Sequence, residues 1–199
     1  TALATSLQSQ VTELEAGQLG AVGDLARSRE LAATVGAIPL QGPGFTITMD
    51  DAPGPGADEA DGSTPEAEQG RVYAKDLRFV VNALWESGAE AVSINGKRLT
   101  SLSAIRFAGS AVIVDNRPLT RPYVITALGD PARFPADFAD GEGGTYLSTL
   151  KGSFGIRVDT KVSKALDVPA AVGLNLRYAT TGDTGGTTPS TATPERSPS

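Results

Sequence analysis

Four arginines flank the central predicted strands and are the residues best suited to bind an anionic partner. The set is Arg98, Arg106, Arg117 and Arg121, accompanied by Asn95, Asp115 and Asn116. A guanidinium group is planar, stays charged at neutral pH and can pair with a carboxylate through two parallel hydrogen bonds. Two interpretations are open: the arginines cap strand ends and pair locally with Asp115, or they form a cationic patch that grips an acidic partner. The candidate ligand or partner contacts are therefore Asn95, Arg98, Arg106, Asp115 and Arg117.

Ser93 and Lys97 raise the question of a serine–lysine catalytic dyad. Such a dyad needs a desolvated lysine with a lowered pKa, because only the neutral amine can accept the serine proton. Lys97 follows a hairpin turn and is expected to be hydrated, whereas Ser93 lies in a short strand where it can simply pack. The structural interpretation is favoured, and no catalytic residue is predicted.

Two acidic clusters have residue types that could bind a metal ion or hydrolyse a sugar. Asp50 and Asp51 precede an acidic loop, but their spacing matches no EF-hand calcium loop. Asp137, Asp140 and Glu142 form the second cluster, and nothing in the sequence around them indicates a sugar cleft. Solvated acidic surfaces are the simpler interpretation. We predict neither a metal site nor a cofactor.

The composition removes several classes of protein. The 199 residues include no cysteine and no histidine, and the formal net charge is −6. Without cysteine there are no disulfides, thiolate zinc sites, iron–sulfur clusters or cysteine nucleophiles, and without histidine there is no Ser-His-Asp triad. An acidic chain is also poorly suited to the phosphate backbone of nucleic acid. We expect no nucleic-acid partner.

Periodic patterns predict strands and helices through the middle of the chain. Phe45, Ile47 and Met49 alternate with threonines, which predicts a half-buried strand. From Lys75 the apolar residues recur at helical spacing, and Trp85 beside this stripe is expected to pack in the core or at its edge. Further strands are predicted at 91–94, 105–107, 111–114, 122–128, 156–162 and 174–178, with a short helix at 145–151. The strand at 111–114 is apolar on both faces and is expected to be central.

The order of these elements predicts an α/β fold of the α+β type, a ferredoxin-like split βαβ sandwich with an inserted hairpin. A single domain is expected over residues 40–179. Within it, residues 51–70 carry acidic residues, prolines and glycines but no large apolar side chain, and they are predicted to be a disordered loop. Residues 180–199 consist mainly of Thr, Ser, Pro and Gly and are predicted to be a disordered tail.

Residues 1–36 are predicted to form a helical stalk. Heptad-like spacing links Leu7, Val11, Leu14, Ala21 and Leu25, and it is interrupted by Gly17, Gly20 and Gly23. The stalk is either the end of a coiled coil that pairs two chains as a homodimer, or a frayed surface helix. Gly36 is expected to end the helix, and Gly42-Pro43-Gly44 to form a turn. No apolar run approaches the length of a membrane span, and the helical pattern is already under way at residue 1, which favours a piece of a longer protein.

Several segments of the domain form a distinctive combination. They are Leu40–Gly44 followed by Asp50 and Asp51, Asp76–Trp85, Gly88–Leu99, Ser103–Gly109, Pro122–Ile125, and Gly129 with Asp130. Together, over about residues 25 to 180, they resemble an uncharacterised bacterial family, Domain of Unknown Function 881.

The resemblance implies a particular arrangement in the full-length parent. Members of the family have a short cytoplasmic start, one membrane helix, a coiled-coil stretch and this domain on the extracytoplasmic face of the plasma membrane. They occur in Gram-positive bacteria, including actinobacteria, often encoded near cell-division or envelope genes. The membrane anchor is therefore expected in the parent but is absent from this chain. The resemblance carries over no activity and no catalytic residue.

Three functional hypotheses follow, in order of preference. The first is a non-catalytic extracytoplasmic interaction or scaffold module of a membrane-anchored protein, which binds a protein of the envelope or cell-division machinery. The alternative is a sensor domain for a small ligand, which a pocket lined by Asn95, Arg98, Arg106 and Arg117 would favour. A hydrolase that works through the serine–lysine pair or through carboxylates comes last.

Overall fold

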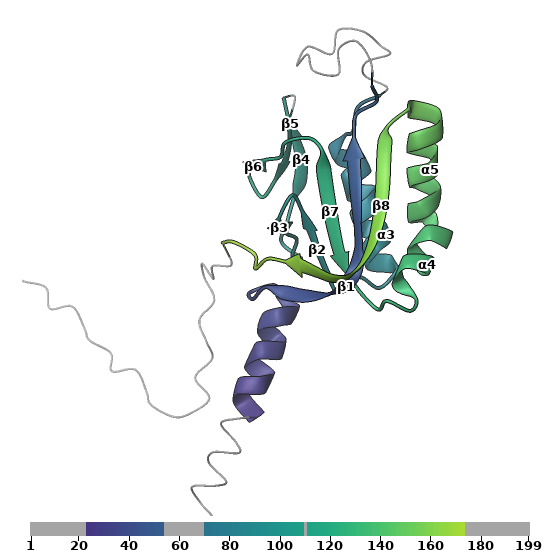
Figure 1. The fold of residues 1–199 in the computed structure, drawn as a ribbon. Coiled ribbons are helices and arrows are strands. Elements are labelled where there is room, and N and C mark those ends of the chain that lie inside the picture. Colours follow the sequence, from purple (N-terminus) through teal and green to yellow (C-terminus); the bar gives the residue numbers. More distant parts are fainter. Residues whose placement is uncertain (1–22, 54–69, 110, 174–199) are drawn as a thin grey trace, which may run out of the picture.

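The computed structural model describes residues 23–53, 70–109 and 111–173 (Figure 1). A helix over residues 23–34 comes first, and Gly36 follows it with a φ of 79°. The Gly36 N–H donates to the carbonyl of Ala33 at 3.1 Å, and the Ala37 N–H donates to the carbonyl of Ala32 at 2.7 Å. These two bonds make a Schellman cap, so the predicted helix stop at Gly36 is confirmed. The rest of the predicted stalk, residues 1–22, lies outside the described residues.

Five strands form one antiparallel sheet in the order β3-β2-β7-β1-β8. They are β1 (Leu40–Asp50), β2 (Ala91–Ile94), β3 (Lys97–Arg98), β7 (Tyr123–Leu128) and β8 (Arg157–Val168). The predicted alternation in β1 is confirmed, because Phe45, Ile47 and Met49 are all fully buried. β1 therefore presents one apolar face to the core and its threonines to the opposite face.

Three helices supply the other half of the core. They are α3 (Ala74–Glu86), α4 (Phe134–Asp140) and α5 (Glu142–Phe154). The ring of Phe45 lies 4.8 Å from the ring of Phe134 and 5.2 Å from that of Phe138, centroid to centroid, so α4 packs on β1. The buried stripe of α3 joins the same core cluster, and Figure 1 shows α3 behind the sheet. Apolar periodicity in the sequence thus translates directly into the packed layer.

A second, smaller sheet is inserted between β3 and β7. It consists of β4 (Ile105–Ala108), β5 (Ala111–Val114) and β6 (Arg117–Pro118), in the order β4-β5-β6. The predicted central strand at 111–114 is the middle strand of this small sheet and not of the main one. Only one of its faces is fully buried, through Val112 and Val114, while Ile113 is half-buried. The apolar residues on both faces therefore misled the prediction.

Apart from this insertion, the main sheet and its helices follow the predicted strand–helix–strand, strand–helix–strand order. The α+β class is thereby confirmed, with mixed helices and antiparallel sheets. The ferredoxin-like assignment stays a prediction. Of the remaining predicted elements, the strand at 174–178 and the tail at 180–199 lie outside the described residues.

The start of β1 corrects the turn predicted at Gly42-Pro43-Gly44. These residues belong to the strand, and the pairing with β8 shifts register between Gly42 and Gly44, which marks a β-bulge. A Cβ built on Gly44 would lie 1.9 Å from the carbonyl oxygen of Ala127. Glycine is used here for the close approach of two strands and not for a turn.

The segment after β7 is more helical than predicted. The short helix expected at 145–151 is α5, which begins at Glu142 and ends at Phe154, and α4 was not foreseen. Gly143 explains part of the difference, because a Cβ there would lie 2.3 Å from the ring of Phe138. The glycines that argued against a helix are thus needed where α4 and α5 meet. β8 likewise runs beyond the predicted end at 162.

Candidate functional site

Asn95 and Gly96 turn the chain between β2 and β3, with φ values of 47° and 71°. The Asn95 Oδ1 accepts from the Val124 N–H at 2.6 Å, and its Nδ2 donates to the carbonyl of Thr120 at 2.7 Å. Both ends of the side-chain amide are therefore used to hold the entry into β7. Asn95 has a structural role here, and the predicted hairpin turn is confirmed.

Arg98 is buried, with a relative exposure of 5%. Its Nη2 donates to the carbonyl oxygen of Ala33 at 3.4 Å, and Nε and Nη1 have no hydrogen-bond partner among the described residues. Burial in a low-dielectric environment lowers the pKa of Arg98 below its ordinary value. This guanidinium faces the end of the helix over residues 23–34 and is not part of a surface patch.

The remaining predicted contacts surround the small sheet. The Asp115 carboxylate accepts from the Ser103 hydroxyl at 2.8 Å and from the Ala104 N–H at 2.9 Å. Arg106 donates from Nη2 to the Asn116 Oδ1 at 3.0 Å, and Arg117 is exposed on β6. Among the described ion pairs, none joins an arginine to Asp115. Local pairing of the arginines with Asp115 is therefore not seen among the described residues, and Asp115 instead ties the turn after β5 to residues 103 and 104.

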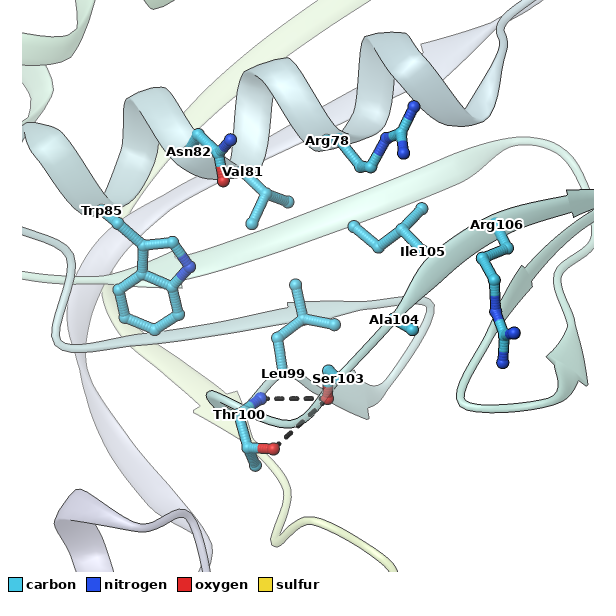
Figure 2. A pocket seen from close by; sticks show the side chains of 10 residues that line it. All are labelled: Arg78, Val81, Asn82, Trp85, Leu99, Thr100, Ser103, Ala104, Ile105 and Arg106. Atoms are coloured by element: carbon cyan, nitrogen blue, oxygen red, sulfur yellow. Dashed lines mark hydrogen bonds between the residues drawn. The ribbon is translucent and has the colours of Figure 1, made fainter.

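A pocket of about 370 Å³ lies between α3 and the chain segment from β3 to β4. Its lining residues are Arg78, Val81, Asn82 and Trp85 from α3, and Leu99, Thr100, Ser103, Ala104, Ile105 and Arg106 from the facing segment. Figure 2 shows the two arginines toward one end, the indole at the other, and the aliphatic side chains between them. Of the five residues predicted from the sequence, the pocket contains only Arg106.

The chemistry of this pocket combines charge with an aromatic surface. The side chains of Arg78 and Arg106 are exposed, and Trp85 is 39% exposed. Of the two positions expected for Trp85, the structure shows the one at the edge of the core, where its indole forms one wall of a surface pocket. Exposed guanidinium groups attract carboxylates, while an indole and an aliphatic floor bind an apolar side chain.

Arg78, Asn82 and Trp85 were missed in the sequence, although a local signal for them exists. With Val81 they occur at positions i, i+3, i+4 and i+7 of α3, which is one face of a helix. The opposing wall comes from residues 99–106, and its position depends on how the small sheet packs against α3. That second half had no signal in the sequence.

Asp51 differs most from its predicted role. It is 4% exposed, its Oδ1 accepts from the Val72 N–H at 2.8 Å, and its Oδ2 forms an ion pair with Arg121. Its neighbour Asp50 forms an ion pair with Arg157 at 2.6 Å. A solvated acidic loop beginning at residue 51 is therefore wrong at that residue, whereas residues 54–69 lie outside the described part of the chain. Within the described residues, no group of three or more acidic side chains could hold a metal ion.

Ser93 and Lys97 do not form a catalytic pair. Ser93 is 2% exposed and stands opposite Arg98, whereas Lys97 stands opposite Ile94. Because neighbouring residues of a strand point to opposite faces, the serine and lysine side chains lie on different faces of the sheet. The second acidic cluster, Asp137, Asp140 and Glu142, is exposed at the ends of α4 and α5.

One more buried carboxylate holds α3 in place. Asp76 is 2% exposed and accepts from the Tyr73 N–H at 2.7 Å in the first turn of the helix. Its other oxygen accepts from the Tyr146 hydroxyl at 2.6 Å, which ties α5 to α3. The pKa of Tyr146 is raised above its ordinary value, mainly by burial and to a smaller extent by this hydrogen bond. The network is structural, since it closes the N-terminal end of α3.

Comparison with known proteins shows that the chain matches a bacterial family. Residues 27–180 match the family described as "Bacterial protein of unknown function (DUF881)". The chain is 39% identical over 158 residues to the UPF0749 protein Rv1823 of Mycobacterium tuberculosis (strain ATCC 25618 / H37Rv), which covers 78% of this chain and 51% of that protein. It is 36% identical over 100 residues to the UPF0749 protein YlxW of Bacillus subtilis (strain 168), covering 49% of this chain and 39% of that protein.

A solved structure shows the same fold. The crystal structure of an uncharacterized conserved protein from Mycobacterium tuberculosis superposes with a TM-score of 0.59 and 27% identity, and covers 77% of this chain and 98% of that one. The chain spans about half the length of the mycobacterial relative. It matches 39% of the length of the Bacillus relative. None of the described helices is long and apolar enough to cross a membrane.

Proposed function

Because the chain belongs to the DUF881 family of bacterial proteins of unknown function, we propose a function from its own surface. The domain acts as a non-catalytic interaction module on the extracytoplasmic face of the plasma membrane. It binds an acidic segment of a protein of the envelope or cell-division machinery. The location and the class of partner rest on the family resemblance in the sequence, and the docking site rests on the pocket between α3 and β4.

The observation that carries the proposal is the composition of that pocket. Arg78 and Arg106 are exposed cations on a chain whose net charge is −6. Trp85 offers an aromatic surface, and tryptophan and arginine are among the residues enriched in the energetic centres of protein interfaces. A partner segment with a carboxylate next to an apolar side chain satisfies both ends of the pocket at once.

A sensor for a small anionic ligand is the second candidate. A volume of about 370 Å³ falls in the range of small-molecule pockets. The sequence favoured a sensor if a pocket was lined by Asn95, Arg98, Arg106 and Arg117. Of these four residues, only Arg106 lines the pocket between α3 and β4. The open position of Trp85 and both arginines favours a side chain presented by a protein over an enclosed ligand.

The test is photo-crosslinking from inside the pocket in the full-length parent. A benzophenone amino acid replaces Asn82, whose side chain is exposed on α3. We expect a defined protein adduct whose crosslinked peptide contains Asp or Glu. The double variant Arg78→Ala/Arg106→Ala is expected to abolish the adduct, while the matched control Arg117→Ala, exposed on β6 outside the pocket, retains it.

The outcomes separate the candidates. An adduct that survives the double variant moves the docking site away from this pocket. Saturation of the pocket by a small anion, detected as protection of Trp85 fluorescence from quenching, would instead favour the sensor. Both arginines are exposed, so their removal is expected to change the unfolding free energy by less than about 0.5 kcal/mol, and a folding defect would be recognised in the same samples.

A further inference from the structure

β8 forms one edge of the main sheet. It pairs with β1 on one side, and no other described strand pairs with its outer side. Figure 1 shows this long strand at the margin of the sheet, on the side away from the small sheet. The opposite edge is β3, which has only two residues. An edge strand exposes unpaired backbone N–H and C=O groups, so β8 is the long free edge among the strands that the structure describes.

A bulge divides β8 into two parts. Gly44 pairs with Ser163, but Gly42 pairs with Leu166, and the Ser163 hydroxyl donates to the carbonyl of Ala165 at 3.1 Å. Residues 157–163 therefore form an uninterrupted stretch that is in register with residues 44–50 of β1. This stretch has a defined centre at Thr160.

The two faces of this stretch are both open around its centre. Asp159 and Lys161 are exposed on the face that carries the β1 threonines. Thr160 and Val162 are exposed on the face where the helices lie, and Val162 is 62% exposed. An element lying over the edge would bury at least one of these sets. Neither α5 nor any other described element covers the centre of the edge.

The sequence of the stretch is self-complementary. In an antiparallel pair of two such strands centred on Thr160, Asp159 of one copy stands opposite Lys161 of the other, twice by symmetry. Val158 stands opposite Val162 in the same way, and Thr160 faces its own copy. Opposite charges and β-branched pairs directly across a ladder are the pairs that stabilise antiparallel sheets.

We propose that two copies of this chain associate through the outer edges of β8, pairing residues 157–163 antiparallel about Thr160. The two-fold axis runs midway between the two copies of Thr160, perpendicular to the sheet, so the two five-stranded sheets join into one and the helices of both copies lie on the same side. The association covers Val162 and leaves the α3–β4 pocket free. This surface differs from the stalk, through which the heptad spacing suggested that two chains could pair as a homodimer.

A competing explanation assigns the charges the opposite role. Charged residues on an edge strand often prevent association with other chains. Edge protection does not require that an acid and a base lie symmetrically about one residue, whereas two-fold pairing does. The two explanations therefore differ in what a charge swap does.

The test measures self-association of the 199-residue chain by sedimentation. We expect a concentration-dependent dimer. Asp159→Lys and Lys161→Asp each place two like-charge pairs in the interface and are expected to raise the dimer dissociation constant by about tenfold or more. The combined swap Asp159→Lys/Lys161→Asp restores opposite pairs and is expected to return the constant to within about threefold of the wild type. Lys164→Asp lies in the bulge, outside the paired stretch 157–163, changes the net charge as Lys161→Asp does and is the matched control.

A second measurement locates the axis. The chain has no cysteine, so Thr160→Cys introduces a single thiol at the proposed axis. Oxidation is expected to give a disulfide-linked dimer rapidly, much faster than for Thr149→Cys on the exposed side of α5. Equal rates at the two positions would overturn the proposal, as would a monomeric wild type at millimolar concentration. A dimer whose dissociation constant is unchanged by Asp159→Lys, by Lys161→Asp and by the combined swap would also overturn the proposal. That result would point to pairing through the stalk.

Discussion

The buried guanidinium of Arg98 donates from Nη2 to the carbonyl oxygen of Ala33, 3.4 Å away, across sixty-five positions of sequence. Ala33 lies in the last turn of the helix over residues 23–34, where carbonyl groups carry the negative end of the helix dipole. Gly36 lies against Arg98 and Thr100, and its carbonyl accepts from the Ala171 N–H at 2.8 Å. The helix therefore leaves the domain in a direction set by contacts with β3 and with the chain after β8.

Replacing Arg98 tests this attachment. In Arg98→Met the apolar stem is kept, but an incompletely paired buried charge is removed, so we expect the unfolding free energy to change by less than about 1 kcal/mol. The helix direction is expected to become less defined, because the bond to Ala33 is lost. Spin labels at Ser28→Cys and Thr149→Cys should give a broader distance distribution than in the wild type. A loss of several kcal/mol would show that the guanidinium is fully paired and contradict this account.

Asp51 is predicted to be the most sensitive carboxylate of the domain. Asp51→Ala removes the acceptor of the Val72 N–H and the partner of Arg121, and is expected to lower the unfolding free energy by about 1–3 kcal/mol. Asp51→Asn keeps an acceptor and should lose less. Chemical denaturation measures both, with Asp130→Ala as the control: its ion pair with Arg133 and its hydrogen bond from the Ala132 N–H are both exposed, so its loss is expected to be smaller than that of Asp51→Ala. Equal losses at Asp51 and Asp130 would refute the burial argument.

Tyr146 predicts how stability changes in alkali. Its pKa is raised by burial and by the bond to Asp76, so above pH 10 the unfolded chain releases the phenolic proton while the folded chain retains it. The unfolded state then binds fewer protons, and stability falls as the pH rises above 10. Tyr123, whose pKa is raised chiefly by burial, adds to the same slope. Tyr146→Phe should flatten the decline between pH 10 and 11, and an unchanged slope would assign it elsewhere.

Alanine substitutions at two glycines are expected to change the unfolding free energy in opposite directions. Gly44→Ala places a Cβ 1.9 Å from the carbonyl oxygen of Ala127, and since backbone must move, we expect a loss of about 2 kcal/mol or more. Gly152 lies in α5 with open space around the added Cβ, so Gly152→Ala should stabilise by about 0.5–1 kcal/mol. Thermal unfolding of both variants decides the point. Stabilisation in Gly44→Ala would mean that β1 and β7 do not approach as described.

Local patterns in the sequence determined several features of this domain. The alternation through Phe45, Ile47 and Met49 predicted the buried face of β1, and the apolar spacing after Lys75 predicted the buried stripe of α3. Asn95-Gly96 and Gly36 predicted their turns, because a positive φ favours those residue types. Each of these features depends on neighbours a few positions away, so one short segment contains all the information.

Only the tertiary structure decided which polar groups are buried and which side chains meet. Asp51 looked like the start of a solvated loop, but its partner Arg121 is seventy positions away and reaches it because β1 and β7 pair. Trp85 was expected in the core or at its edge, and it lies at the edge, in the same pocket as Arg106, because the small sheet packs against α3 without covering the indole. Such contacts depend on how elements far apart in the sequence pack together. Residue periodicity reports only on neighbours within one element and carries no information about that packing.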